Sequence, residues 1–428
     1  MAEAARRQEG AAALLAAHPA PAGEAGWARE AREAARARLL AMGVPAPRDE
    51  YWRFTDPAGL IRPSPQDAAL LTPDEKPVFG DFDRLQLVFV DGVFSPELSD
   101  PPEMTGLVIQ RLDEVLATDI HWARDLFGQL ESRGQEPVAR PFAALNTACA
   151  ATGVVIRATG PTPKPVSLRY LHRSTSSDAL IRHLVRVDPG ASLTLMESGP
   201  AAARLNLCME VEIGAGGRLD HVRAQGRDHE RQAITHAFVR LGQGSVYKSF
   251  TLTMNGRLTR NEQLVELTGP GASAHVAGAC VGDGDFHHDD TVLVIHDAPG
   301  CESRQVFKKV LRNGATGVFQ GKILVRPDAQ NTDGYQLSQG LMLDEDSQFL
   351  AKPELEIHAD DVKCSHGSTV GGVDETALFY LTSRGIARNE AENLLILAFL
   401  DEPLAEIADE RYAEDLRTRL QRWLARRR

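Results

Sequence analysis

Cys364 and His366 are the residues of this sequence whose types and spacing point most directly to chemistry. They lie in the stretch from Leu355 to Val370, LEIHADDVKCSHGSTV, which has the composition of a strand. Side chains alternate across a strand, so we expect the thiol and the imidazole on one face and Ser365 on the other. Such a pair can lower a thiol pKa, bind a transition metal through sulfur and nitrogen, or act as nucleophile and base in acyl transfer.

Two further donors precede the pair. His358 and Asp360 lie an even number of residues before Cys364 and His366. If the strand is unbroken, one face would therefore carry up to four donors. An interruption at Ala359 and Asp360 would destroy that alignment. We therefore treat His358 and Asp360 as second-tier candidates.

Composition restricts the classes of partner. The 428 residues carry a formal charge of −12, which argues against broad contact with nucleic acid or an anionic membrane. No signal peptide and no 18-residue apolar run are recognisable, and the odd number of widely spaced cysteines is typical of a reducing compartment. We expect a cytoplasmic protein. The cysteines other than Cys364 each stand alone among apolar or turn residues, as core-filling side chains do: Cys149, Cys208, Cys280 and Cys301.

Short apolar runs recur between glycine turns from about residue 154 to residue 370. The turn glycines lie 26, 28, 27 and 29 residues apart: Gly190, Gly216, Gly244, Gly271 and Gly300. A near-constant interval with almost no helical periodicity predicts a coiled β-solenoid, in which each turn of the chain hydrogen-bonds to the next. A double-sheet sandwich is the competing fold.

The remaining sequence indicates the other parts of the chain. We predict a flexible segment over residues 1–22, a mainly helical domain with a short β hairpin over 23–138, a β-helix core over 139–372 and a C-terminal helical domain over 373–428. The aromatic residues between Tyr51 and Pro57 are interpreted as anchors of a small helical subdomain. The last helix has an apolar stripe, interpreted mainly as a cover for the end of the solenoid and alternatively as a docking surface: Leu404, Ile407, Leu416, Leu420, Trp423 and Leu424.

A second polar cluster runs from His287 to Asp290, with His296 and Asp297 nearby. Adjacent residues of a strand face opposite ways, so at most part of this set converges. We interpret it as polar side chains that hydrogen-bond along the solenoid rather than as a metal site.

Two enzyme hypotheses remain open. A carbohydrate-active β-solenoid enzyme would use Asp333, Glu354 and Arg326, but the aromatic content of 6% is low for sugar stacking and no export signal is recognisable. A hydrolase would use Cys364 with His366. The sequence contains none of the patterns GxxxxGKS, GxxxxGKT and GxSxG, so neither ATP hydrolysis nor serine hydrolysis is predicted.

Several long stretches resemble the SufB/SufD family of iron-sulfur cluster assembly scaffolds. They include HHDDTVLVIHDAPGCESRQVFKKVL, GVFQGKILVRPDAQNTDGYQLSQGLML and PELEIHADDVKCSHGSTVGGVDETALFYLTSRGI, with YWRFTDP as an N-terminal echo. The thiol motif reads CSHG where SufB members resemble CEHEA, so the SufD branch is the nearer match. The resemblance implies a right-handed parallel β-helix between helical terminal domains, in a scaffold subunit that is not an enzyme.

The resemblance also implies partners. A SufB-like homologue would meet this chain at Cys364 and His366, where a nascent cluster forms, and a homodimer in isolation stays possible. Iron-sulfur clusters usually take four protein ligands and the strand supplies two, so we expect a transient cluster at a subunit interface and no stably bound cofactor. A SufC-like ABC ATPase would bind the C-terminal segment through Val373, Asp374, Leu378, Phe379, Tyr380, Arg384, Gly385, Ala391 and Leu394.

Overall fold

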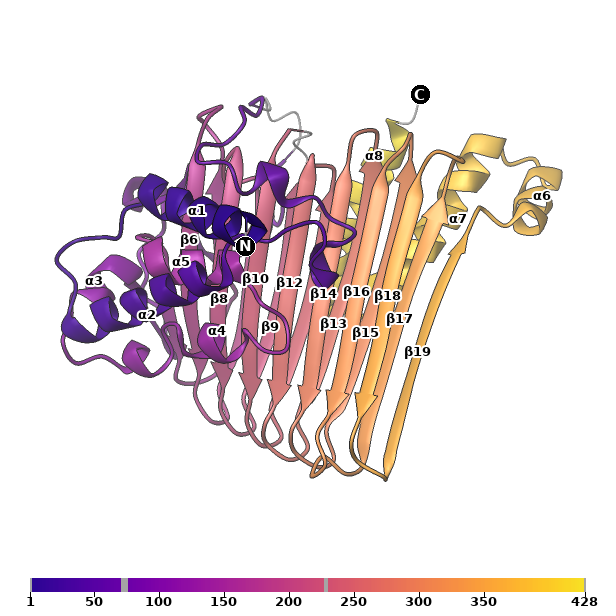
Figure 1. Ribbon diagram of the computed structural model, residues 1–428. Helices are drawn as coiled ribbons and strands as arrows, with labels where there is room; N and C mark the ends of the chain where they lie inside the picture. Colours follow the sequence, from indigo (N-terminus) through magenta and orange to yellow (C-terminus); the bar gives the residue numbers. More distant parts are fainter. Residues whose placement is uncertain (1, 71–75, 227–229, 427–428) are drawn as a thin grey trace.

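The chain forms a β-solenoid of about seven turns with helices on two sides (Figure 1). The computed structural model describes residues 2–70, 76–226 and 230–426. From residue 154 onward, successive strands alternate between two sheets, so each turn of the solenoid adds one strand to each sheet. This confirms the predicted mainly β solenoid with flanking helices, and the sandwich alternative is wrong.

Within the described residues, the two sheets have ten and nine strands. The ten-stranded sheet contains, in spatial order, β2 (Val93–Phe94), β1 (Leu85–Val90), β5 (Val166–Leu171), β7 (Ser192–Ser198), β9 (Arg218–Gly226), β11 (Val246–Met254), β13 (Ser273–Asp283), β15 (Glu302–Arg312), β17 (Thr332–Met342) and β19 (Val362–Gly371). The nine-stranded sheet contains β3 (Leu107–Arg111), β4 (Val154–Ala158), β6 (Asp178–Val187), β8 (Arg204–Ile213), β10 (Gln232–Leu241), β12 (Leu258–Leu267), β14 (His287–His296), β16 (Thr316–Val325) and β18 (Gln348–Ile357).

The repeat arises from the glycine turns. Gly190, Gly216, Gly244, Gly271 and Gly300 all have φ between 59° and 72°, and a Cβ added at any of them would meet no atom within 4 Å. The left-handed backbone, not lack of space, therefore requires glycine at these five corners. Because the same corner recurs in each turn, neighbouring strands stack in parallel without a shift in register.

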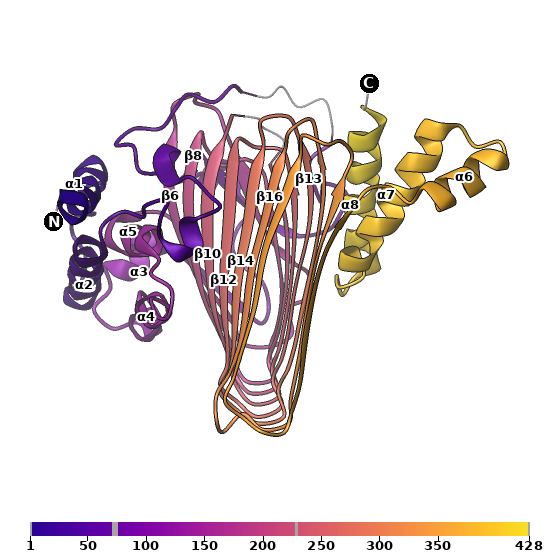
Figure 2. The same ribbon diagram turned by 45° about the vertical axis from the view of Figure 1, so that its right-hand side comes forward.

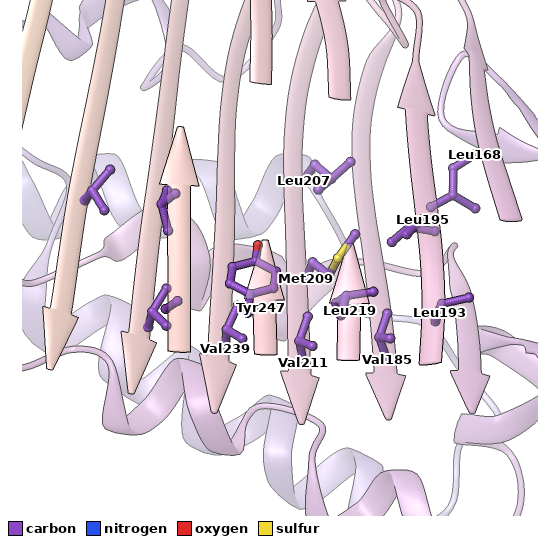
Figure 3. Packing of buried hydrophobic residues seen from close by; sticks show 14 of the residues in the cluster. Leu168, Val185, Leu193, Leu195, Leu207, Met209, Val211, Leu219, Val239 and Tyr247 are labelled. Carbon is purple, nitrogen blue, oxygen red and sulfur yellow. The ribbon is translucent and has the colours of Figure 1, made fainter. Parts of the chain in front are cut away.

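Apolar side chains fill the space between the two sheets. In β8, Leu207, Met209 and Val211 point inward together, as their period of two requires, and they meet Val185 and Val239 of the neighbouring strands (Figure 3). All five are at most 1% exposed. Burying each such side chain stabilises the fold by about 2 kcal/mol.

The N-terminal helices cover the outer face of the nine-stranded sheet (Figure 2). They are α1 (Ala2–Ala17), α2 (Gly26–Met42), α3 (Leu112–Leu116), α4 (Gln129–Arg133) and α5 (Pro141–Cys149), with short 3-10 helices η1 (Glu50–Trp52), η2 (Pro57–Gly59) and η4 (Trp122–Asp125). A further 3-10 helix, η3 (Pro96–Leu98), lies beside β1 of the ten-stranded sheet. The prediction of a flexible segment over residues 1–22 was wrong for residues 2–17, because Ala11, Leu14 and Leu15 are buried against α2 and α5.

Three strands of the N-terminal region join the solenoid sheets. β1 and β2 form the expected antiparallel hairpin, with Phe89 opposite Phe94. β1 also pairs in parallel with β5, and β3 pairs with β4. The sheets therefore extend beyond the core that we predicted to begin at residue 139, and the helix α5 lies between that residue and β4.

The C-terminal helices are α6 (Glu375–Ser383), α7 (Arg388–Leu404) and α8 (Glu410–Ala425). The predicted apolar stripe is buried, but it packs on Val306, Val310 and other side chains on the outer face of the ten-stranded sheet. The expectation that it covers the end of the solenoid was wrong. Figure 2 shows α7 and α8 on the side opposite the N-terminal helices, with α6 projecting away from the sheet.

Candidate functional site

Cys364 and His366 lie on β19, the last strand of the ten-stranded sheet (Figure 1). β19 is continuous and pairs in parallel with β17, which places Cys364 beside Gly334 and His366 beside Gln336. Gly334 and Gln336 are buried on the inner side of their strand. The thiol and the imidazole therefore both extend from the side of β19 that faces the interior of the solenoid.

The thiol is partly enclosed and the imidazole is exposed. Cys364 packs on an apolar cluster that includes Ile323 and Ala359, and its Sγ lies 3.2 Å from the position that a Cβ on Gly334 would take. Burial raises the pKa of the Cys364 thiol, with nearby Asp333 adding to the effect and a backbone hydrogen bond at Gly334 opposing it. The thiol is thus protonated at neutral pH, and a metal must displace that proton to bind sulfur.

His358 and Asp360 do not line up with the pair, so the expectation of four donors on one face was wrong. β18 ends at Ile357 and β19 begins at Val362, and the corner between the two strands breaks the alternation of side chains. His358 is exposed and its Nε2 lies 2.9 Å from Oε1 of Glu356, while Asp360 is exposed in the corner. Among the described residues, no group of three His, Cys, Asp or Glu side chains could hold a metal ion.

The cluster around His287 splits between the two sides of β14, as expected. His288 and Asp290 face the interior, where Nζ of Lys309 lies 2.7 Å from Oδ2 of Asp290 and 2.9 Å from Nδ1 of His288. Asp289 faces outward and accepts a hydrogen bond of 2.6 Å from Thr55. These contacts make the cluster a set of hydrogen-bonded structural residues.

The carboxylates of the sugar-enzyme hypothesis are far apart. Asp333 lies on β17 of one sheet and Glu354 on β18 of the other, and both extend outward. Oε2 of Glu354 accepts a hydrogen bond of 2.7 Å from Tyr51. Asp333 and Glu354 therefore do not face each other across a groove, and the raised pKa of Cys364 equally disfavours a thiolate hydrolase.

The predicted ATPase-binding residues fall into three groups. Phe379, Tyr380 and Leu394 are 71%, 55% and 45% exposed, whereas Leu378 and Ala391 are buried. The rest support the shape of the segment: Asp374 caps α6 by accepting hydrogen bonds from the backbone of Thr376 and Ala377, Gly385 follows α6 with φ of 87°, Arg384 stacks on Tyr380, and Val373 is partly buried.

Sequence reasoning found one role of the segment around Tyr51 and missed another. As expected, Trp52 anchors the N-terminal helices, with its ring centre 5.6 Å from that of Phe142 of α5. The segment also crosses the outer face of the nine-stranded sheet. Trp52 stacks under Arg260 of β12, Thr55 bonds Asp289 of β14, the Tyr51 carbonyl accepts from Gln320 of β16, and the Tyr51 hydroxyl donates to Glu354 of β18. We call residues 50–57 the strap. It reaches the last strand of this sheet.

A second missed feature lies beneath His366. Gln336 and Gln305 occupy successive register positions below it and are fully buried. Their spacing of 31 residues in the sequence is close to the repeat interval, which is the signal that could have revealed them.

The fold and the site define a class of protein, a parallel β-solenoid with a thiol and an imidazole on the inner side of its last strand. No helix of the described residues is long and apolar enough to cross a membrane. A family model described as SUF system FeS cluster assembly, SufBD core domain, matches residues 170–399, more than half of the chain. The chain therefore belongs to the SufBD family.

Individual relatives agree with this assignment. The chain is 26% identical over 402 residues to the iron-sulfur cluster assembly protein SufD of Escherichia coli, covering 90% of each chain. It is 28% identical over 397 residues to a SufBD family protein of Synechocystis, covering 88% of this chain and 86% of the relative. SufD of Bacillus subtilis is 30% identical over 246 residues, 55% of each chain.

Proposed function

We propose that this chain is a SufD-like, non-catalytic scaffold subunit of a SUF complex. It helps to build and transfer a nascent iron-sulfur cluster at an interface with a SufB-like homologue, while a SufC-like ABC ATPase binds its C-terminal helices. The observation that carries the proposal is the pairing of a thiol and an imidazole on a strand at the open end of the solenoid.

The donor count supports a shared site. A cluster usually needs four protein ligands, and Cys364 and His366 supply two. The other cysteines are buried within apolar clusters and cannot reach the end of the solenoid. The cluster is therefore cargo that needs ligands from a second subunit, and a site with few ligands from each side favours release.

The end of the solenoid supports a partner of the same fold. β18 and β19 stand last in their sheets, so within the described chain each pairs on one side only. Ile357 and Val370, at the end of each strand, are 40% and 57% exposed. Open strand edges beside exposed apolar side chains are suited to pairing with strands of another chain.

The helix α6 and the first turns of α7, residues 375–394, form a segment that we call the C-terminal arm. This arm supports a second, separate partner. Phe379 and Tyr380 on α6 and Leu394 on α7 expose large apolar surfaces on a segment that projects from the body (Figure 2). Aromatic side chains of this kind are frequent anchors of protein interfaces. We assign the arm to the ATPase.

Co-expression with a SufB-like and a SufC-like protein, followed by anaerobic reconstitution, tests the cluster site. Cys364→Ser and His366→Ala should each lower the cluster yield of the purified complex by several-fold. Ser365→Ala, which alters the outer side of the same strand, should leave the yield unchanged. Equal yields in all variants would contradict the proposed site, and recovery of this chain alone or as a stable homodimer would contradict the proposed complex.

Substitutions at two adjacent residues test whether the arm binds the ATPase. Phe379→Ala removes an exposed ring and should reduce co-purification of the ATPase while leaving the melting temperature unchanged. Leu378→Ala removes a buried side chain and should lower the free energy of unfolding by about 2–3 kcal/mol. Undiminished ATPase recovery with Phe379→Ala would argue for another docking surface.

A further inference from the structure

A cleft of about 450 Å³ opens on the outer face of the nine-stranded sheet, at the corners that follow β6, β8 and β10. Its volume is within the range of about 300–1,000 Å³ that small-molecule sites have. It lies in the N-terminal half of the solenoid, away from the last strands β18 and β19. The proposed function therefore makes no use of it.

The wall of the cleft carries more arginine than carboxylate. Among the described residues, three guanidinium groups and two carboxylates line it: Arg157, Arg186 and Arg240, with Asp188 and Glu212. The chain as a whole has a formal charge of −12, so the sign of the charge is reversed locally. A concave surface with an excess of positive charge attracts anions.

Two of the arginines stand side by side. Arg157 of β4 and Arg186 of β6 occupy the same register position on adjacent strands, which lie about 4.8 Å apart. Their like charges repel, although each has one carboxylate partner, Asp188 at 2.9 Å and Glu212 at 2.7 Å. The positive charge extends to His121, whose pKa is lowered first by burial and then by these two arginines. An anion between them would relieve the repulsion.

The third arginine has unused donors. Nε of Arg240 lies 3.7 Å from Oε2 of Glu266, which is too long for a hydrogen bond. The Arg240 guanidinium makes no hydrogen bond within the part of the chain that the structure describes, and Nε of Arg186 is likewise without one. A guanidinium group has five N–H donors, and leaving them unpaired in a partly buried side chain costs free energy.

We propose that this cleft binds the phosphate group of a small phosphorylated molecule through Arg186 and Arg240. Arginine presents its donors in a planar fork that matches phosphate oxygens. The cleft has far more room than a phosphate group needs, and Pro189 and the turn backbone at Gly214 and Gly242 also line it. The organic part of the ligand rests against this surface. The proposal does not depend on the proposed function.

Isothermal titration calorimetry of the isolated chain with phenyl phosphate tests the proposal. Low ionic strength is used because salt screens partly exposed charges. The wild type should bind the probe, and should bind inorganic phosphate more weakly because that ion lacks an apolar part. Arg240→Gln removes charged donors and should weaken binding of phenyl phosphate at least about tenfold. Its melting temperature should not change, because the guanidinium makes no hydrogen bond in the free protein.

Two further variants act as controls. Arg326→Gln removes the same charge at an exposed corner after β16, and should leave the affinity within about twofold of the wild type. Glu212→Gln removes a carboxylate that competes for Arg186, so it should tighten binding. If Arg240→Gln does not fold, Arg240→Lys replaces it. That variant keeps the charge but loses the planar fork, and should weaken binding several-fold.

The site is rejected if the wild type shows no binding at about 10 mM phenyl phosphate. Equal weakening by Arg240→Gln and Arg326→Gln would mean that the overall charge of the chain attracts the probe, and weaker binding by Glu212→Gln would mean that the carboxylate is not a competitor. Benzoate tests the ligand class, since it carries a carboxylate on the same ring. Benzoate binding as tight as that of phenyl phosphate would overturn the assignment to phosphate.

Discussion

The hydroxyl of Tyr51 donates a hydrogen bond of 2.7 Å to Oε2 of Glu354, across 303 residues of sequence. Nζ of Lys352 lies 4.2 Å from the centre of the Tyr51 ring and also pairs with Glu50 and Glu354. This contact ties the strap to the last strand of the nine-stranded sheet. The strap thereby links the N-terminal helices to the open end of the solenoid.

Tyr51→Phe should lower the free energy of unfolding by about 1 kcal/mol, because it removes a partly exposed hydrogen bond to a carboxylate. Urea unfolding followed by circular dichroism measures the change. Tyr380→Phe, on the exposed face of α6, is the control and should be neutral. A neutral result for Tyr51→Phe would mean that Lys352 alone holds the strap on β18.

Substitution of Glu210 should lower the free energy of unfolding far more than substitution of Tyr51. Its carboxylate pairs with Arg182 and accepts hydrogen bonds from the backbone of Gly128 and Glu131, and the Arg182 and Glu210 side chains are 0% exposed. Glu210→Ala removes the carboxylate that pairs directly with the buried arginine and leaves Glu131 as its nearby acidic side chain, so we expect a loss of about 3–5 kcal/mol in urea unfolding.

Glu212 provides the comparison on the same strand. It pairs with Arg186, but the two side chains are 34% and 20% exposed. Glu212→Ala should therefore cost about 1 kcal/mol or less. Similar losses for the two variants would show that burial does not govern these ion pairs.

The stability of the fold should decrease as the pH falls below about 6.5. Burial lowers the pKa of His296 to about 4, and His183, His236 and His287 have pKa values lowered to about 4 for the same first cause. Between pH 6.5 and 4 the unfolded chain binds more protons than the folded chain, so the free energy of unfolding rises with pH in this window.

His296→Gln should reduce that slope by about 1 kcal/mol per pH unit near pH 5.5, since it removes one such group. Unfolding in urea at several pH values between 5 and 7 measures it. Ser303→Ala removes the hydrogen bond of 2.8 Å that His296 makes, but keeps the imidazole. It should lower stability with little change in slope, and an unchanged slope in His296→Gln would refute the assignment.

Cys364 should be the reactive thiol of the isolated chain. Cys149, Cys208, Cys280 and Cys301 are buried and Cys364 is partly exposed. A coloured disulfide reagent should modify one thiol in the native protein and all five in denaturant. Because burial raises the pKa of Cys364, the reaction should accelerate as the pH rises above neutrality. Rapid modification at acid pH would contradict this, and Cys364→Ser should abolish the native reaction.

The repeat of the fold was predictable because local backbone geometry determines the residue type at its corners. Gly190 and the four glycines that follow it at this interval adopt positive φ and mark five corners of the solenoid in the sequence, while Asn331 takes the next corner with φ of 57°. The placement of Cys364 and His366 on one face of a strand was predictable for a similar reason, because side chains alternate along a strand with a fixed period of two. The assumption failed at His358, where one corner interrupts the strand.

Features set by distant contacts were not predictable from the same patterns. The apolar stripe of α8 shows that Leu416 and Leu420 must be buried, but does not show whether they cover the end of the solenoid or the face where they lie. The same limit applies to Leu14, which is buried only because α1 meets α2 and α5. The position of Gln336 beneath His366 follows from the repeat interval that separates it from Gln305, but no pattern within a single strand reveals it.

The connection between β19 and α6 has a mechanical consequence. β19 ends at Gly371 and α6 begins at Glu375, so a tether of three residues joins the projecting arm to the strand that carries Cys364. That strand lies at the edge of its sheet and is held by hydrogen bonds along one side only. Any pull on the arm therefore reaches the sulfur and the imidazole before it strains the rest of the molecule.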